Sequence, residues 1–154
     1  MPEIEEIDTY DYRIIRALVR NAKLSMSALA ERVGLSKTPV SQRVKRLEQS
    51  GVIRGYSALL NHSKLGLDHI AFVQVHLSDT RSRTLASFNN AVRKIPEVEQ
   101  CHMTAASFDY LLKVRTTDIV QFRQVLGETL ANLPNVSSTS TYVAMETVKD
   151  ATLL

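Results

Sequence analysis

Cysteine is almost absent from this sequence, because Cys101 is the one thiol among 154 residues. A single thiol excludes an internal disulfide bond and a cysteine-based zinc site. Long apolar runs are missing as well, so no segment is predicted to span a bilayer, and we expect no membrane partner. Residues 1–6 are acidic and lack the basic and apolar parts of a secretory signal peptide. Together these absences predict a cytoplasmic protein.

Residues that commonly carry catalysis or bind metals are few and scattered. The four histidines are His62, His69, His76 and His102. On one predicted strand, His69 and His76 are an odd number of positions apart and so project from opposite faces. No glycine-rich phosphate loop is present either. The sequence therefore predicts neither an enzyme nor a protein with a metal or organic cofactor.

The charge of the chain is unevenly distributed. Residues 1–60 carry ten Lys or Arg and seven Asp or Glu, whereas residues 61–154 carry nine of each, so the first part holds the whole net charge of +3. From residue 37 to residue 54 the cations are Lys37, Arg43, Lys45, Arg46 and Arg54, and the one acid is Glu48. Such an excess favours a polyanionic partner, although a solvated helix face would give the same pattern.

Apolar spacing changes near residue 60, and every regular element predicted before that point is a helix. The first helix begins at Asp8, whose side chain can cap it. Gly34 ends the second helix, and Ser36 caps the third. A short extended piece then runs to residue 60. We therefore predict a first domain over residues 1–60 and a hinge over residues 61–68.

Strands and helices alternate in the second predicted domain, residues 69–154. Strands are predicted over 69–77, 98–104 and 110–115 and within 135–148, and helices over 84–94 and 118–132. The order is βαββαβ. With right-handed crossovers, this order gives a ferredoxin-like fold, with both helices on one face of a four-stranded antiparallel sheet. The predicted fold class of the whole chain is therefore α+β.

One face of this predicted sheet has no helix of its own to cover it. Ile70 and Phe72, or their neighbours, must nevertheless point toward that face. An apolar face without cover usually meets another subunit. We therefore expect a homodimer built by the second domain.

The second and third helices of the first domain form a helix-turn-helix pattern. Ala30 is small where the two helices must cross closely, and Gly34 permits the turn between them. Val40, Val44 and Leu47 recur at i, i+4 and i+7 and attach the third helix to the core. The opposite face of the third helix then points outward with short polar groups and cations, which suit base edges and phosphates in a major groove of double-stranded DNA.

The residues of this face divide by chemistry. Thr38, Ser41 and Gln42 are the candidates for reading bases, because their side chains are polar and uncharged. The remaining candidates for DNA contact, mainly with phosphates, are Ser36, Lys37, Arg43, Lys45 and Arg46. Some of these cations can instead pair with Glu31 or Glu48, and the spacing leaves both possibilities open.

Three segments carry a resemblance to a known family. They are residues 7–15, 29–53 and 126–146, and the similarity extends over roughly residues 7–150. The chain resembles the Lrp/AsnC, or feast/famine, family of transcription regulators, and the last segment is most similar to the leucine-responsive branch. The resemblance implies a winged helix-turn-helix domain joined by a hinge to a ferredoxin-like sensing domain. It also implies dimers, often assembled into octamers, that bind an amino acid and regulate genes of amino-acid metabolism.

The same resemblance places an amino-acid effector site around the connection between the second and third strands. The positions that match the site of the relatives are Met103, Ala105, Ala106, Ser107, Phe108, Asp109, Ile119, Tyr142, Val143 and Ala144. Asp109 either pairs with the ammonium group of the effector or acts as a turn residue bonded to its own backbone. Met103, Ile119 and Val143 either line an apolar pocket or belong to the core.

Two features leave the sensing role open at this stage. Ala106 stands where the family commonly has glycine, and its methyl group can crowd a ligand carboxylate unless the backbone φ angle is negative. An architectural DNA-binding protein of the same fold, without a response to a small molecule, would share the same helix-turn-helix. The sequence-based function is therefore an amino-acid-responsive DNA-binding regulator, with the architectural protein as its alternative.

Overall fold

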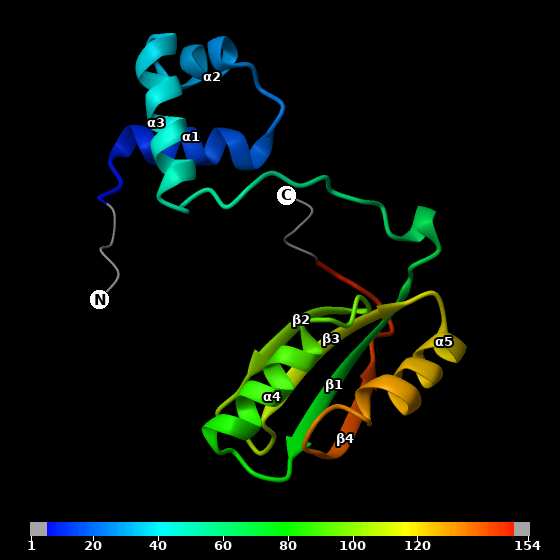
Figure 1. Cartoon of the computed structure of the whole chain (residues 1–154). Helices are drawn as coiled ribbons and strands as arrows, with labels where there is room; N and C mark the ends of the chain where they lie inside the picture. Colours follow the sequence, from blue (N-terminus) through cyan, green and yellow to red (C-terminus); the bar gives the residue numbers. More distant parts are fainter. Residues whose placement is uncertain (1–5, 150–154) are drawn as a thin grey trace. The chain divides into compact units, whose positions relative to one another are not determined.

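The computed structural model describes residues 6–149, which form two compact units. The first unit runs to Leu59 and the second from Leu60 to Lys149, one residue from the boundary that we predicted. Figure 1 shows helices in the first unit and a sheet with two helices in the second. The α+β fold class is confirmed. Among the described residues, no helix is long and apolar enough to cross a membrane.

The first unit consists of three helices around a small apolar core. They are α1 (Thr9–Arg20), α2 (Met26–Val33) and α3 (Lys37–Gln49). Asp8 caps α1, as predicted, and Gly34 ends α2 with a left-handed φ of 77°. Ser36 occupies the N-cap position of α3 but makes no side-chain capping hydrogen bond there. Fully buried side chains of all three helices, including Ile14, Leu29 and Leu47, form the core.

The segment after α3 stays in contact with the last turn of that helix. Residues 54–61 belong to no helix or strand. The Ile53 N–H donates to the Leu47 carbonyl at 2.9 Å, and the Tyr56 hydroxyl donates to Glu48 at 2.7 Å. Burial of this hydroxyl and its bond to Glu48 raise the pKa of Tyr56 to about 12. Glu48 is therefore bound to Tyr56 in the segment that follows α3.

The second unit has the predicted order of elements. They are β1 (His69–Leu77), α4 (Ser82–Val92), β2 (Val98–Met103), β3 (Tyr110–Thr116), α5 (Ile119–Gln124), a π-helical stretch η2 (Val125–Leu130) and β4 (Val136–Val143). The strands lie in the order β2-β3-β1-β4, and all the neighbouring pairs are antiparallel. This arrangement is the ferredoxin-like sheet expected from the sequence.

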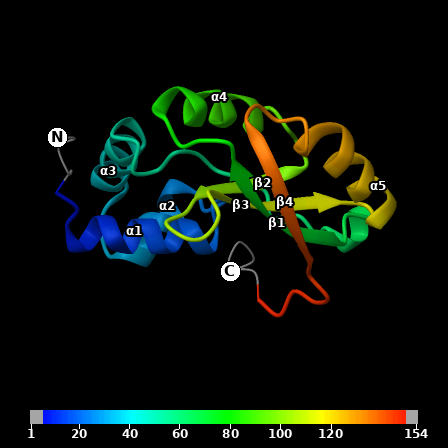
Figure 2. The ribbon, with the colours of Figure 1, turned by 90° about the horizontal axis from the view of Figure 1, so that it is seen from below.

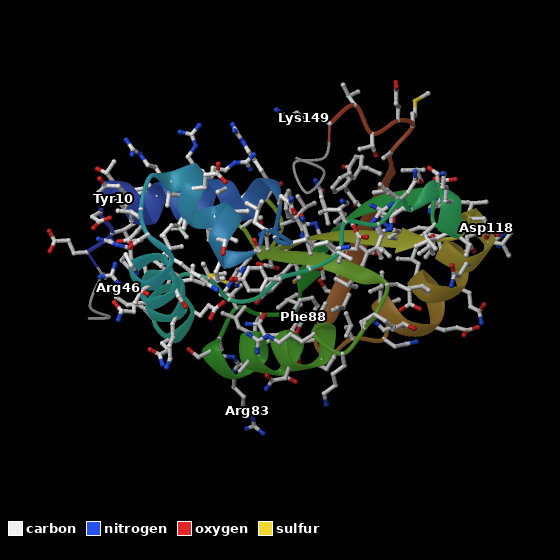
Figure 3. All side chains as sticks on the ribbon, turned by 90° about the horizontal axis from the view of Figure 1, so that it is seen from above. Tyr10, Arg46, Arg83, Phe88, Asp118 and Lys149 are labelled. Carbon is white, nitrogen blue, oxygen red and sulfur yellow. The ribbon has the colours of Figure 1, made fainter. Side chains whose placement is uncertain are left out.

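Both helices cover the same face of this sheet (Figures 1 and 2). The alternate β1 residues Val73 and Val75 are fully buried against Phe88 of α4 and Phe122 of α5. Phe88 points from α4 toward the sheet, whereas Arg83 on the same helix points away from it (Figure 3). The period-2 pattern of β1 and the period-3.6 pattern of α4 therefore meet in one core.

The last predicted helix needs two corrections. A continuous helix was expected over 118–132, but it is α-helical only to Gln124 and widens into a π-helix around Gly127. Glycine has a low helix propensity, which makes this stretch the easiest part of the helix to distort. Ile119, which we expected either to line a pocket or to belong to the core, is 49% exposed and therefore does not belong to the core. It is the first helical residue after the cap Asp118, at the N-terminal end of α5.

The other sheet face carries no helix of the second unit among the described residues, as predicted, but it is only partly apolar. Phe72 and Tyr142 are paired across β1 and β4 and are 37% and 56% exposed. Beside them, Glu99 binds Lys113 at 3.2 Å and also binds the buried Arg115. Burial opposes the negative charge of Glu99, but the bonds from Arg115 and Lys113 outweigh it and lower the pKa of the carboxyl group. Here apolar and ion-paired groups share a face that we expected to be apolar.

Candidate DNA interface and effector site

The exposed face of α3 carries the predicted DNA contacts. Val40, Val44 and Leu47 are buried and hold the helix against the core, so the opposite side of α3 is turned to solvent. The candidates that lie exposed there are Ser36, Lys37, Thr38, Ser41, Gln42 and Lys45. They combine hydrogen-bonding groups with two cations and include no acid. This composition suits contact with base edges and phosphates.

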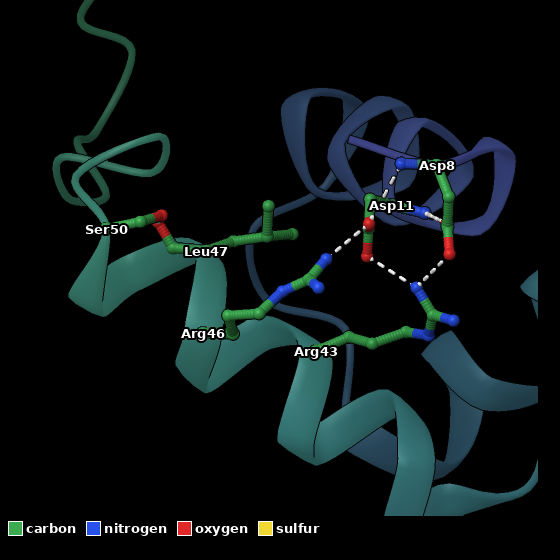
Figure 4. A network of polar contacts seen from close by, with 6 residues as sticks. All are labelled: Asp8, Asp11, Arg43, Arg46, Leu47 and Ser50. Atoms are coloured by element: carbon green, nitrogen blue, oxygen red, sulfur yellow. Dashed lines mark hydrogen bonds and ion pairs between the residues drawn. The ribbon is translucent and has the colours of Figure 1, made fainter. Parts of the chain in front are cut away.

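The two remaining candidates, Arg43 and Arg46, lie on the flank of α3 that faces the start of α1 (Figure 4). The Arg43 Nη1 donates to Asp8 Oδ2 at 2.6 Å and to Asp11 Oδ1 at 2.8 Å. The Arg46 Nη2 donates to Asp11 Oδ2 at 2.5 Å. The acids that these arginines bind therefore lie at the start of α1. They are not Glu31 or Glu48, the two partners that the sequence had suggested. The guanidinium groups are still partly exposed, with side-chain exposures of 27% and 48%.

Asp8 and Asp11 also form a capping box at the start of α1. The Asp11 N–H donates to Asp8 Oδ1 at 2.9 Å, and the Asp8 N–H donates to Asp11 Oδ2 at 3.1 Å. The Asp11 N–H and the Arg43 guanidinium lower the pKa of the Asp8 carboxyl. Asp11 is fully buried, and its carboxylate accepts from the Asp8 N–H, from Arg43 and from Arg46, as a buried carboxylate requires. One pair of carboxylates thus caps α1 and fixes the position of α3.

The predicted effector residues fall into two groups at opposite ends of β1. The first group consists of Met103, the last residue of β2, and the loop 105–109 that follows this strand. Within it, the Asp109 N–H donates to the Val75 carbonyl at 3.0 Å, and Asp109 Oδ2 accepts from the Leu77 N–H at 2.7 Å. This group therefore lies at the C-terminal end of β1.

The second group lies at the N-terminal end of β1. Tyr142 pairs with Phe72, Val143 pairs with Ala71, and the Ala144 N–H donates to the Ile70 carbonyl at 2.9 Å. Ile119 opens α5 just after β3, whose last residue is paired with the first residue of β1. From Ala71 to Leu77 a strand rises about 20 Å. A single chain therefore does not bring the ten candidates together.

The loop 105–109 is closed by two hydrogen bonds from Thr104. The Thr104 N–H donates to the Asp109 carbonyl at 2.9 Å, and the Thr104 hydroxyl donates to the Phe108 carbonyl at 2.8 Å, which closes the loop. The backbone N–H groups of residues 105–108 have no hydrogen-bond acceptor among the described residues. Ala106 has a negative φ, because Asn135 is the one non-glycine residue of the described chain with a positive φ. Its methyl group therefore imposes no backbone strain.

Sequence reasoning had left two roles open for Asp109, and the structure shows a third. Its carboxylate accepts from the backbone of β1, not from its own loop. One oxygen, Oδ2, makes this bond, and no hydrogen bond to Oδ1 occurs within the described part of the chain. Sequence reasoning also missed the part played by Asp8 and Asp11 in positioning α3. Their sequence signal, acids at the start of a helix, indicates a cap and not a partner more than thirty residues away.

Comparisons with known proteins agree with the fold and with its division into two parts. Residues 7–54 match the winged helix-turn-helix DNA-binding family, and residues 70–154 match the Lrp/AsnC ligand binding domain. These matches define the chain as a transcription regulator with separate DNA-binding and ligand-binding parts. The chain belongs to the Lrp/AsnC family.

Relatives of known role align over nearly the whole chain. A proline dehydrogenase transcriptional activator of Rhizobium radiobacter is 56% identical over 146 residues, 95% of this chain and 94% of the relative. The leucine-responsive regulatory protein of Escherichia coli (strain K12) is 43% identical over 150 residues, 97% of this chain and 92% of the relative.

Solved structures are also similar to this chain over nearly its whole length. A transcriptional regulator of Neisseria meningitidis in complex with L-methionine has a TM-score of 0.87 at 32% identity, covering 94% of each chain. A feast or famine regulatory protein of Mycobacterium tuberculosis, complexed with L-methionine, has a TM-score of 0.86 at 30% identity, covering 95% of this chain and 97% of the other. The chain is accordingly a DNA-binding transcription regulator with a ligand-binding domain of the Lrp/AsnC type.

Proposed function

We propose that the chain regulates a gene of proline breakdown and that L-proline is its effector. This proposal is supported by the proline dehydrogenase transcriptional activators of Rhizobium radiobacter and Rhodobacter capsulatus, which are 56% and 53% identical to the chain. The leucine-responsive relatives are less similar, at 43% identity. In this proposal the protein acts as a regulator without catalytic activity, in the cytoplasm, where it meets chromosomal DNA.

DNA is bound by the exposed face of α3. Thr38, Ser41 and Gln42 read bases, while Lys37 and Lys45 contact phosphates. The network of Asp8 and Asp11 supports this assignment, because it holds the helix in one position against α1 and so fixes the direction of the reading side chains. Arg43 and Arg46 reach phosphates only with the part of each guanidinium group that the network leaves exposed.

The protein assembles through the uncovered sheet face. Two copies pack their sheets against each other, and Phe72 and Tyr142, which are exposed side by side, lie at the centre of the contact. A twofold dimer presents two α3 helices, so its operator is a pseudo-palindrome with half-sites one or more helical turns apart. Dimers assemble further, toward an octamer.

The effector binds where the two groups of candidate residues meet across a subunit contact. The single observation that carries this proposal is their separation by about 20 Å along β1 within one chain. The amides of residues 105–108 bind the carboxylate, and Asp109 Oδ1 binds the ammonium group. Ile119, Tyr142, Val143 and Ala144 of another copy, with Met103 of the first, enclose the short apolar ring of proline.

Calorimetry on the full chain tests this assignment. We expect heat of binding with L-proline, little with D-proline, and weaker binding with L-leucine and L-methionine. An operator fragment upstream of a proline dehydrogenase gene should change its affinity for the protein when L-proline is added. If every amino acid gives no heat and leaves DNA binding unchanged, the architectural protein without an effector becomes the better assignment.

A further inference from the structure

The outer side of α4 is basic, although residues 61–154 together carry no net charge. Residues 80–96, which contain α4, hold four Lys or Arg and no Asp or Glu, whereas the rest of residues 61–154 holds five Lys or Arg and nine Asp or Glu. One of the four cations, Arg81, is paired with Asp79 at 2.8 Å. Positive charge is therefore concentrated around one helix of the second unit, which favours a polyanionic partner.

The polar side chains of α4 lie along one side of the helix. Arg83, Ser87, Asn90 and Lys94 recur at i, i+4, i+7 and i+11, and all four are exposed. The Lys94 N–H donates to the Ala91 carbonyl at 3.1 Å, so Lys94 still follows the turn of the helix that it succeeds. The opposite side of α4 is buried against the sheet, from which Arg83 points away (Figure 3).

The cations of this side have no acidic partner within the chain. No hydrogen bond or ion pair within residues 6–149 engages the side chain of Arg83 or Lys94. Arg93, the C-cap residue of α4, donates to Asn90 Oδ1 at 3.4 Å, and this partner is neutral. The three cations therefore keep their charge for an external partner. We refer to Arg83, Ser87, Asn90, Arg93 and Lys94 as the α4 basic face.

The α4 basic face has the composition of a DNA contact and not of a protein contact. Among the large apolar side chains exposed in the described part of the chain, none belongs to α4. Protein partners are held mainly by buried aromatic and apolar anchors, whereas Lys, Arg, Ser and Asn are groups that contact DNA phosphates and sugars. From Arg83 to Lys94 the helix rises about 16 Å, and a DNA strand has a phosphate about every 3.4 Å, so each cation can reach a phosphate of its own.

The strength of such a contact indicates which DNA occupies the face. Sequence-independent affinity increases with the number of phosphates neutralised, so three contacts are weak by themselves. A duplex that is already bound by α3 has a high effective concentration at the rest of the same protein. The DNA best able to occupy the face is therefore the DNA that continues beyond the operator.

We propose that the α4 basic face binds the backbone of DNA that flanks the operator, while α3 reads the operator itself. The three cations bind phosphates, and Ser87 and Asn90 add neutral hydrogen bonds to the same backbone. The second unit then contributes to DNA affinity directly. This function goes beyond operator recognition and beyond the amino-acid response.

Affinity measurements on the full chain with two duplexes test this proposal. One duplex is a minimal operator with only the two half-sites, and the other extends it at each end by random sequence of about 30 base pairs, or about 100 Å. The test variant is Arg83→Gln/Arg93→Gln/Lys94→Gln. The matched control is Lys64→Gln/Arg123→Gln/Lys149→Gln, which removes three exposed cations from other parts of the second unit.

We expect the wild type to bind the extended operator at least about tenfold more tightly than the minimal one. The test variant should lose most of this gain, while its affinity for the minimal operator stays within about twofold of wild type. On the extended operator, the slope of log affinity against log salt should be lower in the variant by about 2.7 for each copy that engages its face, because each phosphate contributes about 0.9. The control should behave like the wild type. Arg83→Lys/Arg93→Lys should preserve the gain, because the contact depends on charge.

An equal gain for the wild type and the glutamine variant would overturn the proposal, since the flanks would then be held by α3 of further copies. Absence of any gain in the wild type would overturn it as well, and an acidic protein would become the better occupant of the face. A variant that loses the same affinity for both duplexes would place the contact on the operator and not on the flanks. Failure of the wild type to bind the minimal operator is a separate result, because it would contradict the function proposed for α3.

Discussion

Asp11 Oδ1 lies 2.8 Å from the Nη1 of Arg43, although the two residues are 32 positions apart. The carboxylate is fully buried, while the arginine belongs to the helix that carries the reading face. A buried charge is stable only when it is paired and hydrogen-bonded. Asp11 is therefore a structural residue with a direct effect on how α3 is presented to DNA.

We expect Asp11→Ala to destabilise the first unit by about 1.5–3 kcal/mol, because hydrogen bonds to charged groups are lost from a buried site. Urea unfolding of the full chain, followed by helical circular dichroism, measures the change. Glu31→Ala, at an exposed position of α2, is the control and should have little effect. A stable Asp11→Ala variant would show that the network does not hold α3 in place.

Acid should weaken the same unit through Asp8. Its pKa is lowered in the folded chain by the Asp11 N–H and by Arg43. The unfolded chain therefore takes up a proton first as the pH falls, so the contribution of Asp8 is complete above about pH 4 and is lost below it. In Asp8→Asn the unfolding midpoint should depend less on pH between about pH 4 and pH 2. An unchanged slope would contradict the role assigned to the carboxylate.

Base reading and phosphate contact can be separated on α3. Gln42→Ala should reduce discrimination between operator and random DNA by about 1–3 kcal/mol, because a bidentate base contact is lost. Lys45→Ala should weaken binding to both DNAs alike and lower the slope of affinity against salt by about 0.9. Both side chains are exposed, so neither change should unfold the chain. An unchanged specificity ratio in Gln42→Ala would move the reading role elsewhere on the helix.

Arg46 shows why such roles need the fold as well as the sequence. Its charge and position predicted a phosphate contact. In the structure its side chain donates to Asp11 of α1, which lies 35 positions earlier in the chain. The order of the elements could be predicted from helical and strand periodicity, because these periodicities involve only residues that are close together in the sequence. The effector candidates depend instead on sheet register, which places Asp109 beside Leu77 and Val143 beside Ala71. No local pattern encodes that separation.

The uncovered sheet face should carry the dimer. Residues 62–154 expressed alone should dimerise at micromolar concentration, as judged by sedimentation, because this part contains the whole face. Phe72→Lys in the full chain should shift the equilibrium to monomer, since a buried ammonium group without a partner is costly. The control Val120→Lys changes an equally apolar residue, 71% exposed, at the start of α5. A monomeric fragment would contradict the proposed contact.

The effector response should depend on Asp109 without involving the DNA-binding unit. In Asp109→Asn the side-chain amide can be oriented so that its oxygen still accepts from the Leu77 N–H, which preserves the loop, but the negative charge available to an ammonium group is lost. We expect the variant to lose the effect of L-proline on operator binding, while ligand-free operator affinity stays within about twofold of wild type. Val143→Ser should weaken the same response through the apolar wall supplied by another copy. Calorimetry and operator binding with and without L-proline measure both effects. A normal response in Asp109→Asn would place the ammonium group elsewhere, whereas a normal response in Val143→Ser alone would confine the site to the loop 105–109.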